Sequence, residues 1–162
     1  MENESPDHAS LQAFYDEGFI TDVLNTIKSG KEATIYLCEA HPRIGAEFLA
    51  AKVYRTPQFR AFRNDAVYRE GRVIRDRRVG RAVRAKTGLG RQAQFGMWVG
   101  QEFETMACLY EVGADIPKPV AIAGKAILME YLGDEQEAAP MLNRVRLAPV
   151  SYTHLTLPTK RI

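Results

Sequence analysis

The 162-residue sequence is poor in the features that mark secreted, membrane-spanning and disulfide-bonded proteins. Its two cysteines, Cys38 and Cys108, stand alone, without the spacing of a metal site or a redox motif. No apolar run approaches the roughly 20 residues that a membrane-spanning helix needs, so we expect no membrane partner. The first ten residues, MENESPDHAS, are acidic and polar and lack the layout of a signal peptide. We therefore expect a cytoplasmic protein with two buried, reduced thiols.

Charge is distributed unevenly along the chain, although the net charge is only +2. Residues 55–91 hold 12 Lys/Arg against 3 Asp/Glu, a local charge of +9, and the remainder holds 10 against 17, a charge of −7. A basic block in an acidic body indicates either an anionic partner or a solvated loop. Eight arginines lie between Arg60 and Arg81, with Phe59, Phe62 and Tyr68 available for stacking, which leaves RNA open as a partner beside the simpler interpretation of a solvated, flexible insertion.

The order of apolar patterns predicts an α+β fold. A short helix in residues 11–19, capped by Ser10 and ended by Gly18, precedes three strand-like segments, ITDVLNTIKSG, ATIYLCEA and FLAAKVYRT. Short turns join these segments, so we expect an antiparallel meander. The basic insertion follows as residues 55–91, in part helical near residues 59–67 and mobile over residues 79–96.

A long amphipathic helix is predicted after the insertion. Apolar residues recur at i, i+4, i+7 and i+11 in MWVGQEFETMACLYEVG, at Val99, Phe103, Met106 and Tyr110, and Gly113 ends the pattern. VAIA and AILMEYL then predict a hairpin. The predicted architecture is a five-stranded antiparallel sheet with one long helix packed across it.

Three regions divide the chain in this prediction. Residues 1–19 form an N-terminal extension with a short helix, and residues 20–149 form the folded domain. Residues 150–162, VSYTHLTLPTKRI, differ from the rest in polarity, charge and periodicity. They resemble a translated cloning or adapter scar, and we exclude them from the predicted fold.

The stretch IKSGKEATIY, residues 27–36, places a Gly-Lys pair between two β-prone flanks. A glycine-bearing turn lets backbone N–H groups approach a phosphate closely. A Walker A motif is excluded, because Glu32 follows the Gly-Lys pair where that motif needs Ser or Thr, and because a strand follows instead of a helix. Taken alone, the turn fits an ordinary hairpin tip better than a phosphate loop.

Lys52 lies inside the apolar segment FLAAKVY, where lysine is seldom buried without a partner. An edge lysine that reaches solvent explains it equally well by itself. However, LAAK has the shape of the kinase strand whose lysine holds nucleotide phosphates and is oriented by a helix carboxylate. Glu102 borders the apolar face of the predicted helix, whereas Glu104 points farther out. Glu102 is therefore the predicted partner of Lys52.

Taken together, these segments resemble the RIO family of atypical serine/threonine protein kinases, in order from about Ile20 to Pro149. SGKEATIYL resembles the family's phosphate loop, AAKVYRT its lysine strand, FGMWVGQEFETMACLYEVGADIPKPVA its C-helix and proline-rich exit, and ILMEYLGDEQEAAPML its hinge. The resemblance implies a kinase-like N-lobe that binds ATP with Mg²⁺. It also implies a parent enzyme that phosphorylates Ser or Thr of a protein substrate, or hydrolyses ATP as a switch. RIO relatives act in small ribosomal subunit maturation, so ribosomal RNA or a pre-ribosomal particle is a compatible partner of the basic insertion.

The same resemblance gives individual residues their roles. Lys52 would contact the α- and β-phosphates and pair with Glu102, as the catalytic pair. The backbone of residues 29–33 would cover the phosphates, and the backbone of the hinge would bind the adenine edge through the C=O of Glu130 and the N–H of Leu132. Met129 would be the gatekeeper, or plain core. The implied ATP-binding set is Ile27, Ser29, Gly30, Lys31, Glu32, Ala33, Ile35, Ala50, Lys52, Met129, Glu130 and Leu132, with Ile27, Ile35 and Ala50 lining the adenine pocket.

The sequence departs from the family in the residues that perform phosphoryl transfer. Transfer needs a catalytic Asp, an Asn and a second Asp for Mg²⁺. The family carries them in an H-x-D-L-S-x-x-N segment and a later Asp motif of its C-terminal lobe. Only His8, His41 and His154 are present, and none begins such a segment. We therefore expect an N-lobe fragment that has no metal ligands of its own and is catalytically inactive.

Overall fold

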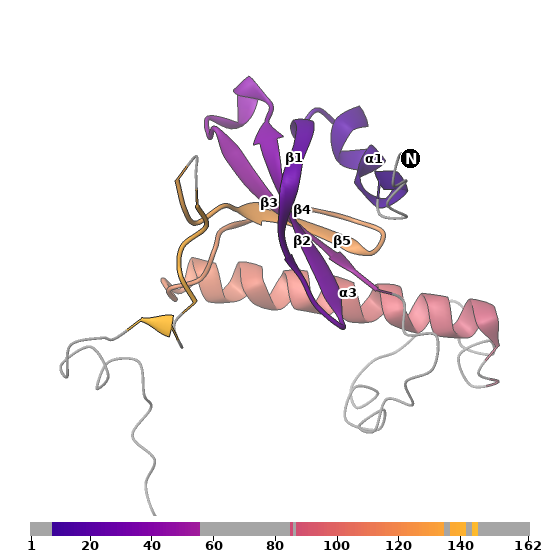
Figure 1. Cartoon of the computed structure of the whole chain (residues 1–162). Coiled ribbons are helices and arrows are strands. Elements are labelled where there is room, and N and C mark those ends of the chain that lie inside the picture. The colour runs from indigo at the N-terminus through magenta and orange to yellow at the C-terminus, as the bar shows by residue number, and fades with distance from the viewer. Residues whose placement is uncertain (1–7, 56–84, 86, 135–136, 142–143, 146–162) are drawn as a thin grey trace, which may run out of the picture. The chain divides into compact units, whose positions relative to one another are not determined.

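The computed structural model describes residues 8–55, 85, 87–134, 137–141 and 144–145. The chain divides into a first unit, Met1–Tyr131, and a second unit, Leu132–Ile162. The first unit contains, in chain order, α1 (His8–Asp16), β1 (Ile20–Ser29), β2 (Ala33–Ala40), the 3-10 turn η1 (Pro42–Ile44), β3 (Phe48–Tyr54), α3 (Gly88–Glu111), β4 (Pro119–Ala123) and β5 (Ala126–Glu130) (Figure 1). This order confirms the predicted α+β architecture.

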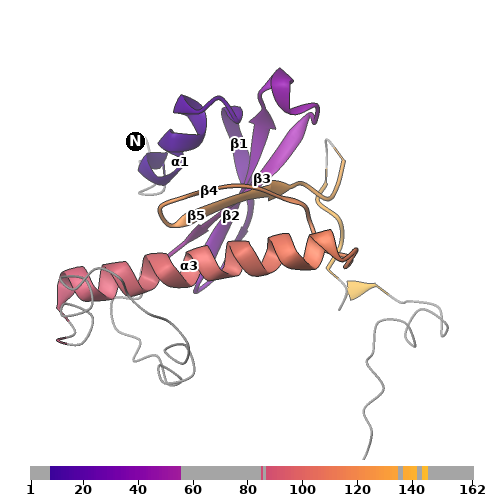
Figure 2. The ribbon, with the colours of Figure 1, turned by 180° about the vertical axis from the view of Figure 1, so that it is seen from behind.

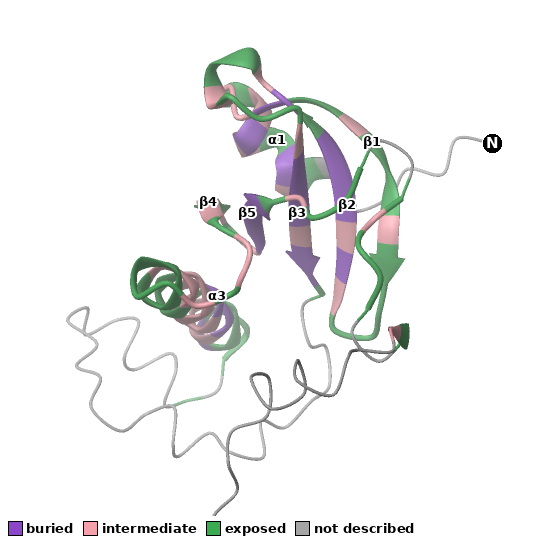
Figure 3. Ribbon diagram, turned by 90° about the vertical axis from the view of Figure 1, so that its left-hand side faces the viewer, coloured by how far each residue is buried: buried purple, intermediate pink, exposed green. Residues whose placement is uncertain are grey.

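The five strands form one antiparallel sheet, as predicted, and the structure gives their order as β1-β2-β3-β5-β4. β5 therefore lies between β3 and β4, although it follows β4 in the chain. β1 is an edge strand, and its pairing with β2 is interrupted by three register shifts. Such bulges twist an edge strand and discourage it from pairing with another chain. Figure 3 shows that burial is concentrated in the central strands, whereas β1 is largely exposed.

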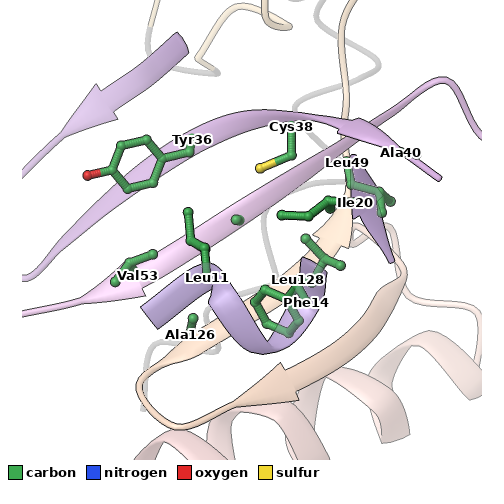
Figure 4. Packing of buried hydrophobic residues seen from close by; sticks show 11 residues of the cluster. Leu11, Phe14, Ile20, Tyr36, Cys38, Ala40, Leu49, Val53, Ala126 and Leu128 are labelled. Atoms are coloured by element: carbon green, nitrogen blue, oxygen red, sulfur yellow. The ribbon is translucent and has the colours of Figure 1, made fainter. Parts of the chain in front are cut away.

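Alternation along the central strands sends neighbouring residues to opposite faces of the sheet. In β3, Leu49, Ala51 and Val53 join a core that α1 covers with Leu11 and Phe14 (Figure 4). We call this cluster the α1-side core.

A second core lies on the other face of the sheet. It contains Ala50 and Tyr54 of β3 and Ile127 of β5, together with Phe95 and Val99 of α3. We call this cluster the α3-side core. α3 runs beside the β4–β5 hairpin and contacts both of its strands (Figures 1 and 2).

α1 ends in a glycine motif that turns the chain into β1. Gly18 has a positive φ of 65°, its N–H donates to the carbonyl of Tyr15, and the N–H of Phe19 donates to the carbonyl of Phe14. The rings of Phe14 and Phe19 meet edge to face at 6.4 Å, which adds the hydrophobic contact typical of this motif. The predicted N-cap at Ser10 is wrong, because the helix begins at His8. Each residue added to a formed helix gains a backbone hydrogen bond, so the helix extends beyond its apolar face.

α3 begins nine residues before the amphipathic pattern from which it was predicted. Thr87 caps its first turn by accepting a hydrogen bond from the N–H of Gly90 at 3.1 Å. The prediction of a mobile segment up to residue 96 is therefore wrong for residues 88–96, and residues 88–91 of the predicted insertion are helical. Burial of Phe95 against the sheet outweighs the poor helix propensity of the glycines around it. The predicted helix near residues 59–67 lies outside the described residues.

The C-terminal end of α3 is less buried than its amphipathic pattern predicts. Val99 is fully buried, but Tyr110 is exposed. Gly113, with a φ of 78°, ends the helix as predicted, and the N–H of Ala114 donates to the carbonyl of Leu109. Among the described residues, no helix is both long and apolar enough to span a bilayer.

Among the described residues of the second unit, Gly133 and Ala138 form a small antiparallel bridge. The N–H of Asp134 donates to the carbonyl of Glu137, whose own N–H donates to Oδ1 of Asp134. The predicted final region, residues 150–162, lies outside the described residues, as do residues 1–7.

Candidate functional site

An ion pair on the α3 side of the sheet joins two residues that are far apart in the sequence. Nζ of Lys52 lies 2.6 Å from Oε1 of Glu102 and donates a hydrogen bond to it. The side chains are 29% and 26% exposed, so the pair borders solvent. A pair at this exposure contributes little to stability. Its effect is to hold the lysine ammonium group at one place on the sheet.

Strand register and helix periodicity explain why these two side chains meet. Lys52 lies opposite Ile35 of β2 and Ile127 of β5, near the middle of the sheet. Glu102 lies between the buried face of α3 and its outer face, whereas Glu104 is exposed. The structure thus brings together Lys52 and the glutamate that the sequence pattern selected. Their roles toward a nucleotide stay a prediction.

Tyr54 lies next to the ion pair, a residue that the sequence analysis did not select. Nζ of Lys52 lies over the Tyr54 ring, 4.8 Å from its centroid, a cation–π geometry. Trp98 of α3 packs against the same ring edge to face at 4.9 Å. Burial raises the pKa of the Tyr54 phenol, and the nearby Glu102 carboxylate raises it further. Alternation was the available signal, because residues 52 and 54 of one strand share a face.

The residues predicted to line or limit an adenine pocket lie together beside the ion pair, with Ala33 of the predicted phosphate-covering segment among them. Ala50 and Met129 are buried in the α3-side core and face each other in the register of β3 and β5. Ile27, Ala33 and Ile35 are partly buried and pack against the same core. The structure therefore gathers five predicted residues from four strands or strand ends into one apolar surface on the face that carries Lys52.

The Gly-Lys turn connects β1 to β2 as a tight hairpin. The N–H of Gly30 donates to the carbonyl of Ala33 at 2.9 Å, and Ser29, Gly30, Lys31 and Glu32 are all exposed. Gly30 does not have a positive φ. A Cβ at this position would meet the Ala33 carbonyl oxygen at 3.4 Å, an ordinary contact. The hairpin therefore does not by itself require glycine.

Arg55 stabilises the base of this turn with hydrogen bonds. The sequence analysis did not identify this role. Its Nη2 donates to the hydroxyls of Ser29 at 2.7 Å and Thr34 at 3.3 Å, and its backbone N–H donates to the carbonyl of Glu32. These contacts link the end of β3 to both strands of the hairpin. A single arginine after the lysine strand was the available signal, but its partners depend on strand register.

The two residues predicted to bind the adenine edge lie in different units. Glu130 ends β5 and is exposed, and its backbone N–H donates to the carbonyl of Lys118 at 2.8 Å. The Glu130 carboxylate accepts a hydrogen bond from the N–H of Lys118 at 3.1 Å. Leu132 belongs to the second unit and is exposed. Adenine binding by the hinge stays a prediction.

The described residues fit a nucleotide better than they fit a metal ion. They offer a cation, an apolar surface and a turn with exposed backbone, which match phosphate and adenine. Among them, no group of three or more His, Cys, Asp or Glu side chains could hold a metal. A cavity of about 830 Å³ lies elsewhere, between α1, the start of α3 and the β4–β5 turn, and none of the predicted site residues lines it.

Most of the arginine-rich segment lies outside the described residues. Only Arg55, residue 85 and residues 87–91 of the predicted insertion are described. Binding of RNA through Arg60–Arg81, with Phe59, Phe62 and Tyr68 as stacking groups, therefore stays a prediction from the sequence.

Comparison with known proteins relates the chain to one family. A family model described as the RIO domain matches residues 34–158. The serine/threonine-protein kinase RIO1 of Caenorhabditis elegans is 27% identical over 134 residues, which cover 81% of this chain and 24% of the relative. The RIO-type serine/threonine-protein kinase Rio1 of Haloferax volcanii is 30% identical over 151 residues, which cover 87% of this chain and 45% of the relative. The chain thus spans less than half the length of either kinase.

Solved structures show the same fold. The Rio2 kinase of Chaetomium thermophilum, crystallised as an ADP/Mg²⁺-phosphoaspartate complex, superposes with a TM-score of 0.56 at 21% identity. This match covers 92% of the chain described above and 38% of that kinase. Another crystal structure of the same kinase gives a TM-score of 0.51 at 23% identity, over 78% of this chain and 34% of the other.

Proposed function

The chain belongs to the RIO domain family, and from this premise we propose that its first unit is the ATP-binding lobe of a serine/threonine protein kinase. The observation that carries this proposal is the 2.6 Å contact between Lys52 on a central strand and Glu102 on α3. An ammonium group held at the border of an apolar surface suits a nucleotide, whose phosphates are anionic and whose base is flat and apolar.

Lys52 is the residue that binds phosphate in this proposal. Its ammonium group would contact the α- and β-phosphate oxygens, and Glu102 would keep it oriented before and after binding. The pair is about a quarter exposed, so the ammonium is accessible to a ligand while still shielded from bulk water. The backbone of residues 29–33, of which residues 29–32 are exposed, would cover the phosphates, with Arg55 fixing the base of the turn.

The apolar surface would bind the base of the nucleotide. Ile27, Ile35 and Ala50 would contact the faces of adenine, and Met129 would limit the depth of the pocket. The backbone C=O of Glu130, at the end of β5, would provide a polar contact to the adenine edge. Backbone groups suit this role, because they impose no requirement on the side chains of the hinge.

Bound ATP supplies the γ-phosphoryl group that a kinase transfers to a Ser or Thr hydroxyl of a protein substrate. We propose that these 162 residues bind the nucleotide but do not transfer that group. No segment of the sequence matches H-x-D-L-S-x-x-N, and no cluster of metal ligands occurs among the described residues. The Asp and Asn ligands for Mg²⁺ and the catalytic Asp would come from a C-terminal lobe. Whether a complete enzyme phosphorylates a protein or uses ATP hydrolysis as a switch, the role of Lys52 is the same.

Titration of the ¹⁵N-labelled chain with MgATP tests the proposal, because NMR detects weak binding. We expect shifts of the amides of residues 29–33 and of the strand around Lys52. Lys52→Met should weaken MgATP binding by about tenfold to a hundredfold, the effect of losing one charge-assisted hydrogen bond. It should leave the affinity for adenosine unchanged, because adenosine has no phosphate.

Lys118→Met is the matched control, because it removes the same charge from an exposed side chain that has no proposed contact with the nucleotide, and it leaves the backbone hydrogen bonds of Lys118 to Glu130 in place. This variant should bind MgATP like the unmodified chain. Equal binding of MgATP by the Lys52→Met variant and the unmodified chain would contradict the proposal.

No structural observation favours the alternative of an RNA-binding module over ATP binding. That prediction requires RNA affinity that falls steeply with salt, because each phosphate contact releases counterions. RNA binding that does not change with salt would remove it.

A further inference from the structure

The hydroxyl of Tyr54 is a buried polar group without a partner. The residue is only 2% exposed, and no hydrogen-bond partner for its Oη exists among the described residues. A buried hydroxyl has lost its hydration, and an unmade hydrogen bond leaves that loss uncompensated. Native proteins leave few such groups, and each one calls for an explanation.

The ring of Tyr54 is fixed, so the hydroxyl cannot turn away to find another partner. Trp98 packs against the ring at 4.9 Å, and Lys52 lies over it at 4.8 Å. The backbone N–H of Tyr54 donates to the carbonyl of Lys125, and strand pairing places the residue opposite Ala33 at the base of the Gly-Lys turn. Any partner must therefore come to the hydroxyl.

Glu102 is the acceptor within reach of that hydroxyl, because the same Lys52 ammonium group lies 4.8 Å from the centroid of the Tyr54 ring and 2.6 Å from Oε1 of Glu102. Hydrogen bonding and charge of this carboxylate also contribute to the raised pKa of the phenol. Among the described residues, the carboxylate accepts one hydrogen bond, from Lys52 to Oε1. A donor and an acceptor that are each incompletely hydrogen-bonded thus lie near each other, without forming a hydrogen bond of full geometry in the free protein.

We propose that Tyr54 is a positioning residue that supports the Lys52–Glu102 pair in two states. In the free protein the ring holds the Lys52 ammonium group. When a phosphate attracts that ammonium, Glu102 loses part of its charge compensation, and the Tyr54 hydroxyl donates to the carboxylate in its place. The inference rests on the proposed function, because it needs an anion that competes with Glu102 for Lys52.

A purely structural role explains the ring but not the hydroxyl. Phenylalanine would fill the same space, pack against Trp98 and offer the same face to Lys52 without burying an unbonded oxygen. The hydroxyl is therefore unfavourable in the free protein and useful only if another state forms its hydrogen bond.

Tyr54→Phe separates these two roles. We expect the free variant to be as stable as the unmodified chain, or more stable, in thermal unfolding. In NMR titration we expect MgATP affinity to fall about tenfold, equivalent to about 1.4 kcal/mol, with adenosine affinity unchanged. Tyr36→Phe is the matched control, because it removes a tyrosine hydroxyl from the α1-side core, on the opposite face of the sheet. It should leave MgATP affinity unchanged.

A double-mutant cycle with Glu102→Gln completes the test. If the hydroxyl acts through Glu102, Tyr54→Phe should have little further effect on MgATP affinity in the Glu102→Gln background. Unchanged MgATP affinity in Tyr54→Phe, additive effects in the cycle, or a variant that is less stable or does not fold would each overturn the inference. The proposed function fails separately, if the unmodified chain does not bind MgATP or if Lys52→Met binds it equally well.

Discussion

The two faces of the sheet are built from the same strands but packed in different ways. The α1-side core contains apolar side chains, the Cys38 thiol and the Tyr36 phenol. The α3-side core is bordered by a partly exposed ion pair and contains the unpartnered hydroxyl of Tyr54. One strand serves both faces, because Leu49, Ala51 and Val53 of β3 point one way while residues 50, 52 and 54 point the other.

This difference shows how a small sheet can be stable and still carry polar groups at a binding surface. The apolar face excludes water and stabilises the strands that hold Lys52 in register. The other face places groups that are costly for stability where a ligand can reach them. If this comparison is right, substitutions on the first face should affect stability, and substitutions around the ion pair should affect binding.

A matched pair of phenylalanines tests the comparison with the largest expected effect. Phe14→Ala should lower the free energy of unfolding by about 3–5 kcal/mol, because it leaves a sealed void in the α1-side core. Phe95→Ala on α3 should cost less, about 2 kcal/mol, because Phe95 already lines the open cavity of about 830 Å³. Urea denaturation of both variants measures the difference. Equal losses would mean that the two faces are equally well packed.

The two cysteines test the same comparison, because a thiol reacts with a reagent in water only where water reaches it. Burial raises the pKa of the Cys38 thiol to about 12, whereas Cys108 is exposed on α3. The prediction of two buried thiols is therefore wrong for Cys108, which lies on the outer side of the helix near its C-terminal end. In the native protein at pH 8, iodoacetamide should therefore alkylate Cys108 alone, and in denaturant it should alkylate both residues. Mass spectrometry gives the count, and modification of native Cys38 would show that the α1-side core opens to solvent.

The raised pKa of Cys38 also predicts how stability changes in alkali. The pKa of the thiol is 9.0 in the unfolded chain and about 12 in the folded protein. The stabilisation of the folded state by the buried, protonated thiol is therefore complete below pH 9 and is lost as the pH rises toward 12. For this thiol, the free energy of unfolding falls by at most about 1.4 kcal/mol per pH unit. Urea denaturation at pH 8 and pH 10 should show a smaller decrease for Cys38→Ala than for the unmodified chain. The same decrease in both would contradict the assignment.

Two glycines give the smallest expected effects, of opposite sign. Gly18→Ala should lower the free energy of unfolding by about 1 kcal/mol, because the left-handed conformation at a φ of 65° strains any residue with a Cβ. Gly96→Ala should gain about 0.5–1 kcal/mol, because Gly96 lies inside α3 and a Cβ there meets no atom within 4 Å. Thermal unfolding compares them. A loss of stability in Gly96→Ala would mean that this side of α3 is more tightly packed than the structure shows.

The sequence predicted what depends on local patterns. Alternation in β2 and the Gly-Lys turn were enough to place the first hairpin, and the apolar stripe of α3 was enough to choose Glu102 over Glu104. The start of α3 could not be predicted, because its glycines carry no helical signal and the burial of Phe95 depends on the sheet. The contacts of Tyr54 and Arg55 depend on the register between β2 and β3, which long-range pairing sets.

The position of β5 between β3 and β4 has a consequence for how the nascent chain reaches its native state. β3 ends at Tyr54, but its second neighbour begins at Ala126. At the usual speed of translation, the ribosome would take on the order of 4 to 15 s to make the intervening chain. During that interval the three-stranded meander has an open edge at β3, the kind of edge to which chaperones or other newly made chains bind.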